Sequence, residues 1–114
     1  MKNSLIQYSD FVKIKICVGT IILIEESEKL KKPSFILTID FGKEIGLKKS
    51  SAQLKANYSS KDLIKRQVLA VINFQPKQIG NIMSEVLVLG LPDNSDQPIL
   101  VGPDLNITNG KQLY

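Results

Sequence analysis

QVLAVINFQPKQIGNIMSEVLVLG, residues Gln67–Gly90, indicates two β-strands joined by a polar loop. Alternation along the first strand places four apolar residues on one face, Val68, Ala70, Ile72 and Phe74. Pro76 is expected to end this strand, because proline has no backbone N–H to donate to a sheet ladder. The second strand is expected from Ser84 to Gly90. Both faces of both strands are apolar, so something must cover the outer face.

The chain before this stretch predicts a long first strand. Val12–Glu26 carries an alternating pattern and then an apolar run, interrupted by Gly19. A long strand bent at a glycine is how a small barrel turns a corner. Cys17 falls on the same face as the lysines of this strand and is expected to be semi-buried.

An antiparallel hairpin is expected next. Ser34–Phe41 alternates well, and Glu44–Lys49 forms the return strand with Leu47 facing inward. The charged segment Glu25–Pro33 before it is interpreted either as a solvated hairpin tip or as a finger that contacts phosphates.

The remaining pattern completes the fold class. Ser50–Arg66 suits short helical turns, one of them capped by Ser59 or Ser60 through Asp62. The order is therefore three strands, a short helix and two strands, followed by a tail. This is the order of an all-β OB-fold, a five-stranded Greek-key barrel with its helix between strands 3 and 4.

Length and composition indicate one domain spanning residues 1–114. Apolar residues make up 43% and charged residues 23%, which is typical of a soluble globular protein. The sequence has no apolar run near the roughly 18 residues of a membrane helix and no signal-peptide pattern. Its single cysteine fits a reducing compartment. We therefore expect a cytoplasmic protein that does not insert into membranes.

The apolar outer faces predict self-association. In a closed barrel, one face of each strand meets solvent, and four aliphatic residues or their alternating partners would then be exposed. These four are Leu69, Val71, Leu87 and Leu89. Monomers rarely expose such a patch. We expect a homodimer, or a contact with an apolar peptide, at these residues, with the terminal segments 1–11 and 102–114 contributing to dimerisation.

The sequence lacks the residues that several kinds of catalytic, metal and phosphate-binding site need. The chain has no histidine, the commonest general base and metal ligand. One cysteine cannot build the usual zinc site. The sequence contains no glycine-rich phosphate loop, and its carboxylates are scattered. We therefore expect no catalytic residue, no metal site and no cofactor.

The charge permits an anionic partner without requiring one. The formal net charge is +4 and the pI is about 9.2. The lysines expected to contact phosphates are Lys31, Lys32, Lys49 and Lys77. The amide side chains expected to hydrogen-bond sugars or bases are Gln53, Asn73 and Gln75. Few aromatic residues are expected outside the core, so binding would rest on shape and phosphate contact and weaken with salt.

Two blocks of sequence, Lys31–Leu54 and Val71–Gly90, together resemble the CsaA family. These are stand-alone tRNA-binding-domain proteins, related to the C-terminal tRNA-binding domain of methionyl-tRNA synthetases. The resemblance implies an OB-fold with flanking terminal segments, a homodimer and tRNA binding directed by RNA structure. It also implies a chaperone activity linked to protein export, with unfolded or preprotein segments as partners.

The resemblance places the binding surface at matching positions of this chain. These positions are Ser50, Ser51, Ala52, Gln53, Asn73, Phe74, Lys77, Ser84 and Glu85. Relatives commonly carry two adjacent basic residues where this chain has Lys77-Gln78, which weakens the electrostatic attraction for tRNA. Asn73 and Ser84 have an alternative role, which is to satisfy backbone groups of the loops.

Three functional hypotheses follow. The first is a non-catalytic protein that binds tRNA through a basic face of the barrel. The second is a chaperone that binds unfolded polypeptide at an apolar groove of the dimer. The third is an accessory that delivers tRNA to a synthetase lacking its own appended domain.

Overall fold

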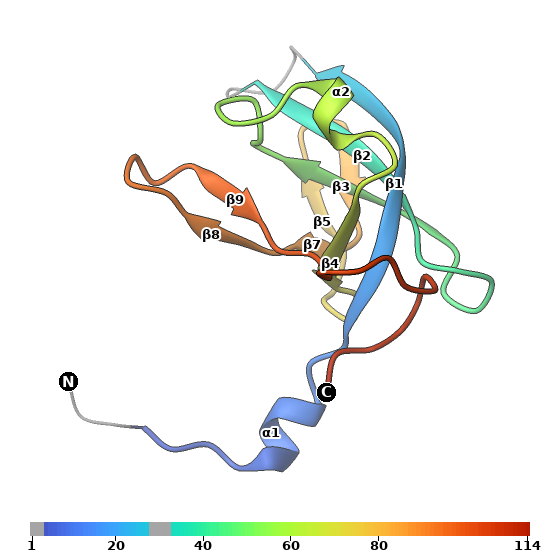
Figure 1. Cartoon of the computed structure of the whole chain (residues 1–114), viewed down its shortest axis with the longest axis vertical. Coiled ribbons are helices and arrows are strands. Elements are labelled where there is room, and N and C mark those ends of the chain that lie inside the picture. Colours follow the sequence, from blue (N-terminus) through green and yellow to red (C-terminus); the bar gives the residue numbers. More distant parts are fainter. Residues whose placement is uncertain (1–3, 28–32) are drawn as a thin grey trace.

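A five-stranded antiparallel sheet forms the body of the molecule in a computed structural model that describes residues 4–27 and 33–114. Its strand order is β3-β2-β1-β4-β7, and it curls into a nearly closed barrel (Figure 1). The strands are β1 (Ile16–Ser27), β2 (Ser34–Asp40), β3 (Leu47–Ala52), β4 (Gln67–Val71) and β7 (Leu87–Val88). The short helix α2 (Ser60–Leu63) lies between β3 and β4. The predicted all-β, OB-type barrel is therefore confirmed. Lys31, Lys32 and most of the charged loop lie outside the described residues.

Two hairpins and a helix extend this barrel. The hairpins are β5 (Lys77–Ile79) with β6 (Ile82–Ser84) and β8 (Gly90–Pro92) with β9 (Pro98–Leu100), and the helix is α1 (Tyr8–Val12). The β8–β9 hairpin and α1 both project from the barrel (Figure 1). No helix in the described part of the chain is long and apolar enough to cross a membrane.

The expected polar loop is instead the β5–β6 hairpin. Gly80 has a φ of 61°, and this left-handed conformation allows the chain to reverse between the two strands. The expected strand Ser84–Gly90 is correspondingly divided among β6, β7 and β8. Alternation alone could not reveal these breaks, because the apolar pattern continues through them.

The barrel core is aliphatic and aromatic. Its fully buried members include Ile21, Phe35, Leu37, Ile39, Phe41, Leu63, Val68 and Ala70. A Cβ at Gly19 would lie 2.6 Å from Ile39 Cγ2 and 2.7 Å from the Phe41 ring, so β1 fits here only without a side chain. The register between β1 and β2 then shifts between Ile21 and Leu23. The predicted glycine in a bent first strand is therefore a packing requirement.

Cys17 corrects one expectation about β1. Its side chain is 2% exposed and belongs to the core, not to the lysine face. The lysines that suggested that face precede the strand, which begins only at Ile16. Val18, on the opposite face, is also buried, since the C-terminal segment pairs with it through Lys111 O and the Gly110 N–H. Burial raises the pKa of the Cys17 thiol.

The return strand β3 also differs from its prediction. It begins at Leu47, because a tight turn joins the Phe41 N–H to Gly46 O at 3.0 Å and the Gly46 N–H to Gly42 O at 2.7 Å. Leu47 is exposed and Ser50 is buried, which reverses the expected facing of the strand.

Helix α2 follows its predicted cap. The Asp62 N–H donates to Ser59 Oγ at 3.4 Å, and the Ser59 N–H donates to Asp62 Oδ2 at 2.9 Å. This is a capping box with aspartate at its third helical position. Of the two serines that the sequence allowed, Ser59 is the cap.

The four outward aliphatic residues are not equally available. Leu87 is exposed, Leu69 and Leu89 are half-buried, and Val71 is only 4% exposed. The chain after β9 lies on β4, where the Leu69 N–H donates to Val101 O at 2.9 Å. The expected exposed patch is thus largely covered within one chain, and Val71 cannot contribute to it.

The packing around Gly19 predicts the effect of a small substitution. Gly19→Ala should lower the free energy of unfolding by about 1–3 kcal/mol, because the new methyl overlaps Ile39 and Phe41. Gly46→Ala meets no atom within 4 Å and should cost only the strain of its positive φ, about 1–2 kcal/mol. Denaturant unfolding measures both. A shifted core aromatic environment in near-ultraviolet circular dichroism should accompany Gly19→Ala alone, and identical spectra for both variants would contradict the overlap.

Candidate nucleic-acid interface

A groove of about 420 Å³ lies where β3, the chain after β4 and the β6–β7 connection meet. We call it the signature groove, and its lining includes Ser51, Phe74, Lys77, Ser84, Glu85 and Leu87. Five of these six are positions that the sequence assigned to RNA binding, and Leu87 was assigned to a dimer or peptide contact. The fold therefore gathers residues from two distant blocks of the chain into one surface.

Side chains close the barrel beside this groove. The Ser51 N–H donates to Ser84 Oγ at 3.1 Å, and the Lys49 N–H donates to Glu85 Oε1 at 3.0 Å. The Glu85 N–H donates to Lys49 O at 2.7 Å. These bonds give the edge of β3 the partners that a neighbouring strand would otherwise supply. Ser84 and Glu85 consequently hold the groove wall in place.

Asn73 serves a different part of the structure. Its Oδ1 accepts from the Lys15 N–H at 2.9 Å, and its Nδ2 donates to Lys13 O at 2.8 Å. Both ends of the amide therefore fasten the segment that leads into β1. Asn73 and Ser84 both take the backbone-satisfying role that the sequence left open.

The accessible part of the groove combines a ring with a cation. Phe74 is 55% exposed, although alternation placed it on the buried face of its strand. Strand β4 ends at Val71, so the alternation no longer applies three residues later. Lys77, at the start of β5, is also exposed and lines the same groove. A free aromatic face next to an ammonium group suits a stacked base and its phosphate.

The other predicted positions lie around or away from this groove. Lys49 is exposed at its edge on β3, whereas Ser50 is buried, and its hydroxyl donates to Ser51 O at 3.5 Å. Gln53 lies in an adjoining groove of about 450 Å³, which also includes Leu87, Leu89, Gln97 and Leu100. We call this second depression the hairpin groove, because β8 and β9 supply one side of it. Ser50 therefore points away from any ligand in either groove.

The sequence missed the contribution of the β5–β6 hairpin and of the chain around β9. Ile79 lines the signature groove and Gln97 lines the hairpin groove. Their exposure depends on hairpins that the apolar pattern did not reveal. Residues 4–27 and 33–114 contain no group of three or more histidine, cysteine, aspartate or glutamate side chains placed to hold a metal ion.

Comparison with known sequences adds a family to this geometry. Residues 16–112 match the family described as "Putative tRNA binding domain". The methionine–tRNA ligase of Methanococcoides burtonii is 33% identical over 112 residues, and that of Thermococcus onnurineus is 28% identical over 112 residues. Each match covers 98% of this chain but only 16% and 15% of the respective ligase. The chain thus spans about one-sixth of the length of these curated relatives.

Solved structures give a closer match over whole chains. A CsaA chaperone from Bacillus anthracis superimposes with a TM-score of 0.89 and 38% identity, covering 97% of this chain and all of that one. A CsaA chaperone from Picrophilus torridus gives 0.88 and 43%, with 96% and 100% coverage. A protein from Pyrococcus horikoshii described as related to methionyl-tRNA synthetase shares the fold, with a TM-score of 0.85 and 19% identity.

The role of Ser84 in closing the barrel leads to a prediction about stability. Ser84→Ala should lower the free energy of unfolding by about 1 kcal/mol, since the Ser51 N–H loses its acceptor. The matched control is Ser95→Ala, on the β8–β9 turn, whose hydroxyl makes no hydrogen bond within the described structure and which should change stability by less than about 0.5 kcal/mol. Urea unfolding separates the two. Equal stability of both variants would show that the Ser84 hydroxyl does not support β3.

Proposed function

The chain belongs to the CsaA family of tRNA-binding-domain proteins, and we propose that it binds tRNA without catalysing a reaction. The observation that carries the proposal is the signature groove, where exposed Phe74 and Lys77 lie beside family-matching positions of β3 and β6. The proposal places this binding in the cytoplasm.

The residues divide into ligand contacts and supports. Lys77 and Lys49 would contact phosphates, joined by Lys31 and Lys32 from the charged loop. Phe74 would stack on an unpaired base, a contact that tolerates any base because every base has a π-face. Gln53 would donate or accept a hydrogen bond from the adjoining groove.

Ser84 and Glu85 act in this proposal as supports. Their side chains hold the backbone N–H groups of Ser51 and Lys49, so the phosphate-facing wall is fixed before RNA arrives. A serine and a carboxylate committed to backbone groups favour a binding surface over a catalytic one. Because only one aromatic face is available in the groove, phosphate contacts would supply most of the affinity.

The amino-terminal arm supports the proposal of a homodimer. Residues 4–7 and α1 project from the barrel (Figure 1), and Leu5 and Ile6 are 93% and 71% exposed. Tyr8, Phe11 and Leu113 line a groove between α1 and the carboxyl terminus. A monomer rarely exposes so much apolar surface on one extension. A second copy of the chain would cover it, with both terminal segments contributing.

A second function rests on the same apolar surfaces. The relatives of known structure from Bacillus anthracis and Picrophilus torridus are described as chaperones. Leu87 in the signature groove and Leu91 on the β8–β9 hairpin are exposed, and apolar side chains of this kind would hold an unfolded or preprotein segment. In this alternative the dimer presents the groove and the lysines contribute little.

Binding of tRNA is tested by filter-binding titration of the wild-type chain and of Lys77→Ala at about 50 mM and 200 mM salt. Wild-type affinity should fall between the two concentrations, and Lys77→Ala should reduce the slope of log K against log[salt] by about 0.7–0.9, as expected for one lost phosphate contact. Lys43→Ala, on the turn between β2 and β3, should leave the slope unchanged. Absence of saturable binding by the wild type even at low salt would remove the proposed function.

The homodimer is tested by light scattering across micromolar concentrations. The expected mass is twice the 12.7 kDa of one chain. The double substitution Leu5→Ser and Ile6→Ser should shift the protein toward the monomer, because it removes the apolar cover of the arm. Leu47→Ser, which changes an exposed leucine on β3 away from the arm, should not. A wild-type particle of one-chain mass at every concentration would exclude the dimer.

A further inference from the structure

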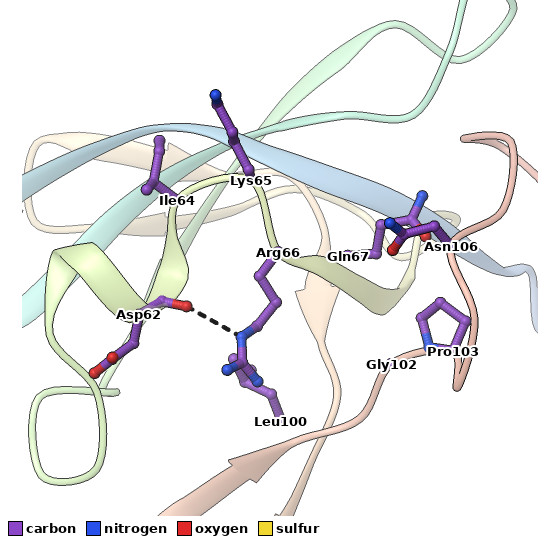
Figure 2. Close-up of a pocket in the computed structure, with 9 residues that line it drawn as sticks. All are labelled: Asp62, Ile64, Lys65, Arg66, Gln67, Leu100, Gly102, Pro103 and Asn106. Atoms are coloured by element: carbon purple, nitrogen blue, oxygen red, sulfur yellow. Dashed lines mark hydrogen bonds between the residues drawn. The ribbon is translucent and has the colours of Figure 1, made fainter.

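Arg66 lies between α2 and β4, and two contacts orient its side chain. Its Nε donates to Asp62 O at 3.2 Å (Figure 2), and its guanidinium lies 5.2 Å from the centroid of the Tyr58 ring. A planar guanidinium tied at Nε and supported by a ring keeps its two terminal NH₂ groups available. The side chain is thus oriented for a ligand at little further entropic cost.

No carboxylate neutralises this guanidinium within residues 4–27 and 33–114. The nearest acid in the sequence is Asp62 on α2, whose carboxylate points away from the guanidinium (Figure 2). The Ser59 backbone N–H and then the Ser59 hydroxyl lower the pKa of Asp62, and the charge of Arg66 adds a smaller effect. Asp62 is therefore committed to the helix cap, and Arg66 remains a free cation.

Arg66 lines the last of three adjoining grooves. It lines a groove of about 470 Å³, which shares Leu100 with the hairpin groove. The hairpin groove in turn shares Ser51 and Leu87 with the signature groove. We call this row of three adjoining grooves, from Lys77 to Arg66, the furrow; Leu100, where the last two grooves meet, is also hydrogen-bonded to Tyr58.

The hairpin wall of this furrow is anchored to the same residues that support Arg66. Tyr58 Oη accepts from the Leu100 N–H at 3.0 Å, and Asn57 Nδ2 donates to Asp93 Oδ2 at 2.9 Å and to Pro98 O at 3.4 Å. The Asn57 amide, followed by two backbone N–H groups, holds the pKa of Asp93 below its ordinary range. Tyr58 thus fixes both the cation and the wall beside it.

The chemistry along the furrow matches an RNA strand. A cation lies at each end, and Gln53 and Gln97 offer amides between them. Three carboxylate residues line it: Glu85, which accepts the Lys49 N–H, Asp96 in the hairpin turn, and Asp62, which accepts the Ser59 N–H. A rigid guanidinium fork suits a phosphodiester, which accepts two parallel N–H bonds.

We propose that Arg66 is a second phosphate-binding residue, and that the RNA backbone follows the furrow from Lys77 to Arg66 between the barrel and the β8–β9 hairpin. This inference rests on the proposed tRNA binding. It extends the site beyond the positions that match the family blocks, because Arg66 lies outside both of them.

The neighbouring lysine provides a matched control. Lys65 carries the same charge and borders the same groove, but its side chain points to the opposite side of the backbone from Arg66 (Figure 2). With unfractionated tRNA as the probe, Arg66→Gln should lower the affinity several-fold and reduce the slope of log K against log[salt] by about 0.7–0.9. Lys65→Gln should leave the slope at its wild-type value. Arg66→Lys should retain the slope, since it keeps the charge, while losing affinity with the planar fork.

The outcomes separate this inference from the function on which it rests. If the wild type fails to bind tRNA, both fall. If the wild type binds with a slope that depends on Lys77, while Arg66→Gln behaves as Lys65→Gln does, the path to Arg66 is wrong and the function stands. If Arg66→Gln lowers the thermal unfolding midpoint, its loss of affinity could reflect unfolding, and the slopes of Arg66→Lys and Lys65→Gln are compared instead. A slope of log K against log[salt] below the wild-type value in Arg66→Lys overturns the proposal. Loss of binding to a denatured polypeptide by Arg66→Gln, with tRNA binding intact, assigns the furrow to polypeptide and also overturns it.

Discussion

The gap between the two edge strands of the barrel is the constraint on which the rest of the structure depends. A five-stranded sheet in the order β3-β2-β1-β4-β7 leaves β3 and β7 unpaired at its ends. An open edge of this kind would expose backbone N–H and C=O groups. Ser84 and Glu85 meet this need with their side chains, and the chain around β6 lies against β3 as a result. Strand β7 has only two residues, and the closure beside it is made by two side-chain bonds and by the backbone bond from the Glu85 N–H to Lys49 O.

This closure also creates the candidate site. Holding β6 against β3 brings the β5–β6 hairpin alongside the end of β4, where Phe74 leaves the core and Lys77 begins the hairpin. Residues that match the family therefore serve two purposes: some build the wall and others face the ligand. Tyr58 also has two roles: its hydroxyl anchors the β8–β9 hairpin, and its ring supports Arg66.

Local signals of the sequence predicted the elements well. The alternation of β2 set its core residues correctly, although the opposite face of this strand is also buried, and the Ser59–Asp62 cap was visible from its spacing. The sequence did not show which residues would be buried by strands and segments that are distant along the chain. Val71 is buried although its face points outward, and Cys17 is buried although its neighbours in sequence are lysines. Both depend on which strands and terminal segments lie nearby, and a period of two cannot report that.

For the candidate site too, the sequence predicted some features and missed those that depend on long-range packing. The motif blocks identified the positions that meet in the signature groove, but not that Asn73 faces the segment before β1 or that Ser50 faces the core. The central claim, that tRNA occupies this groove, is tested most directly by amide hydrogen exchange with and without tRNA. The account predicts slower exchange at Ser51–Gln53 and along the β5–β6 hairpin in the complex. Protection confined to α1 and the carboxyl-terminal segment, with the groove unchanged, would contradict it.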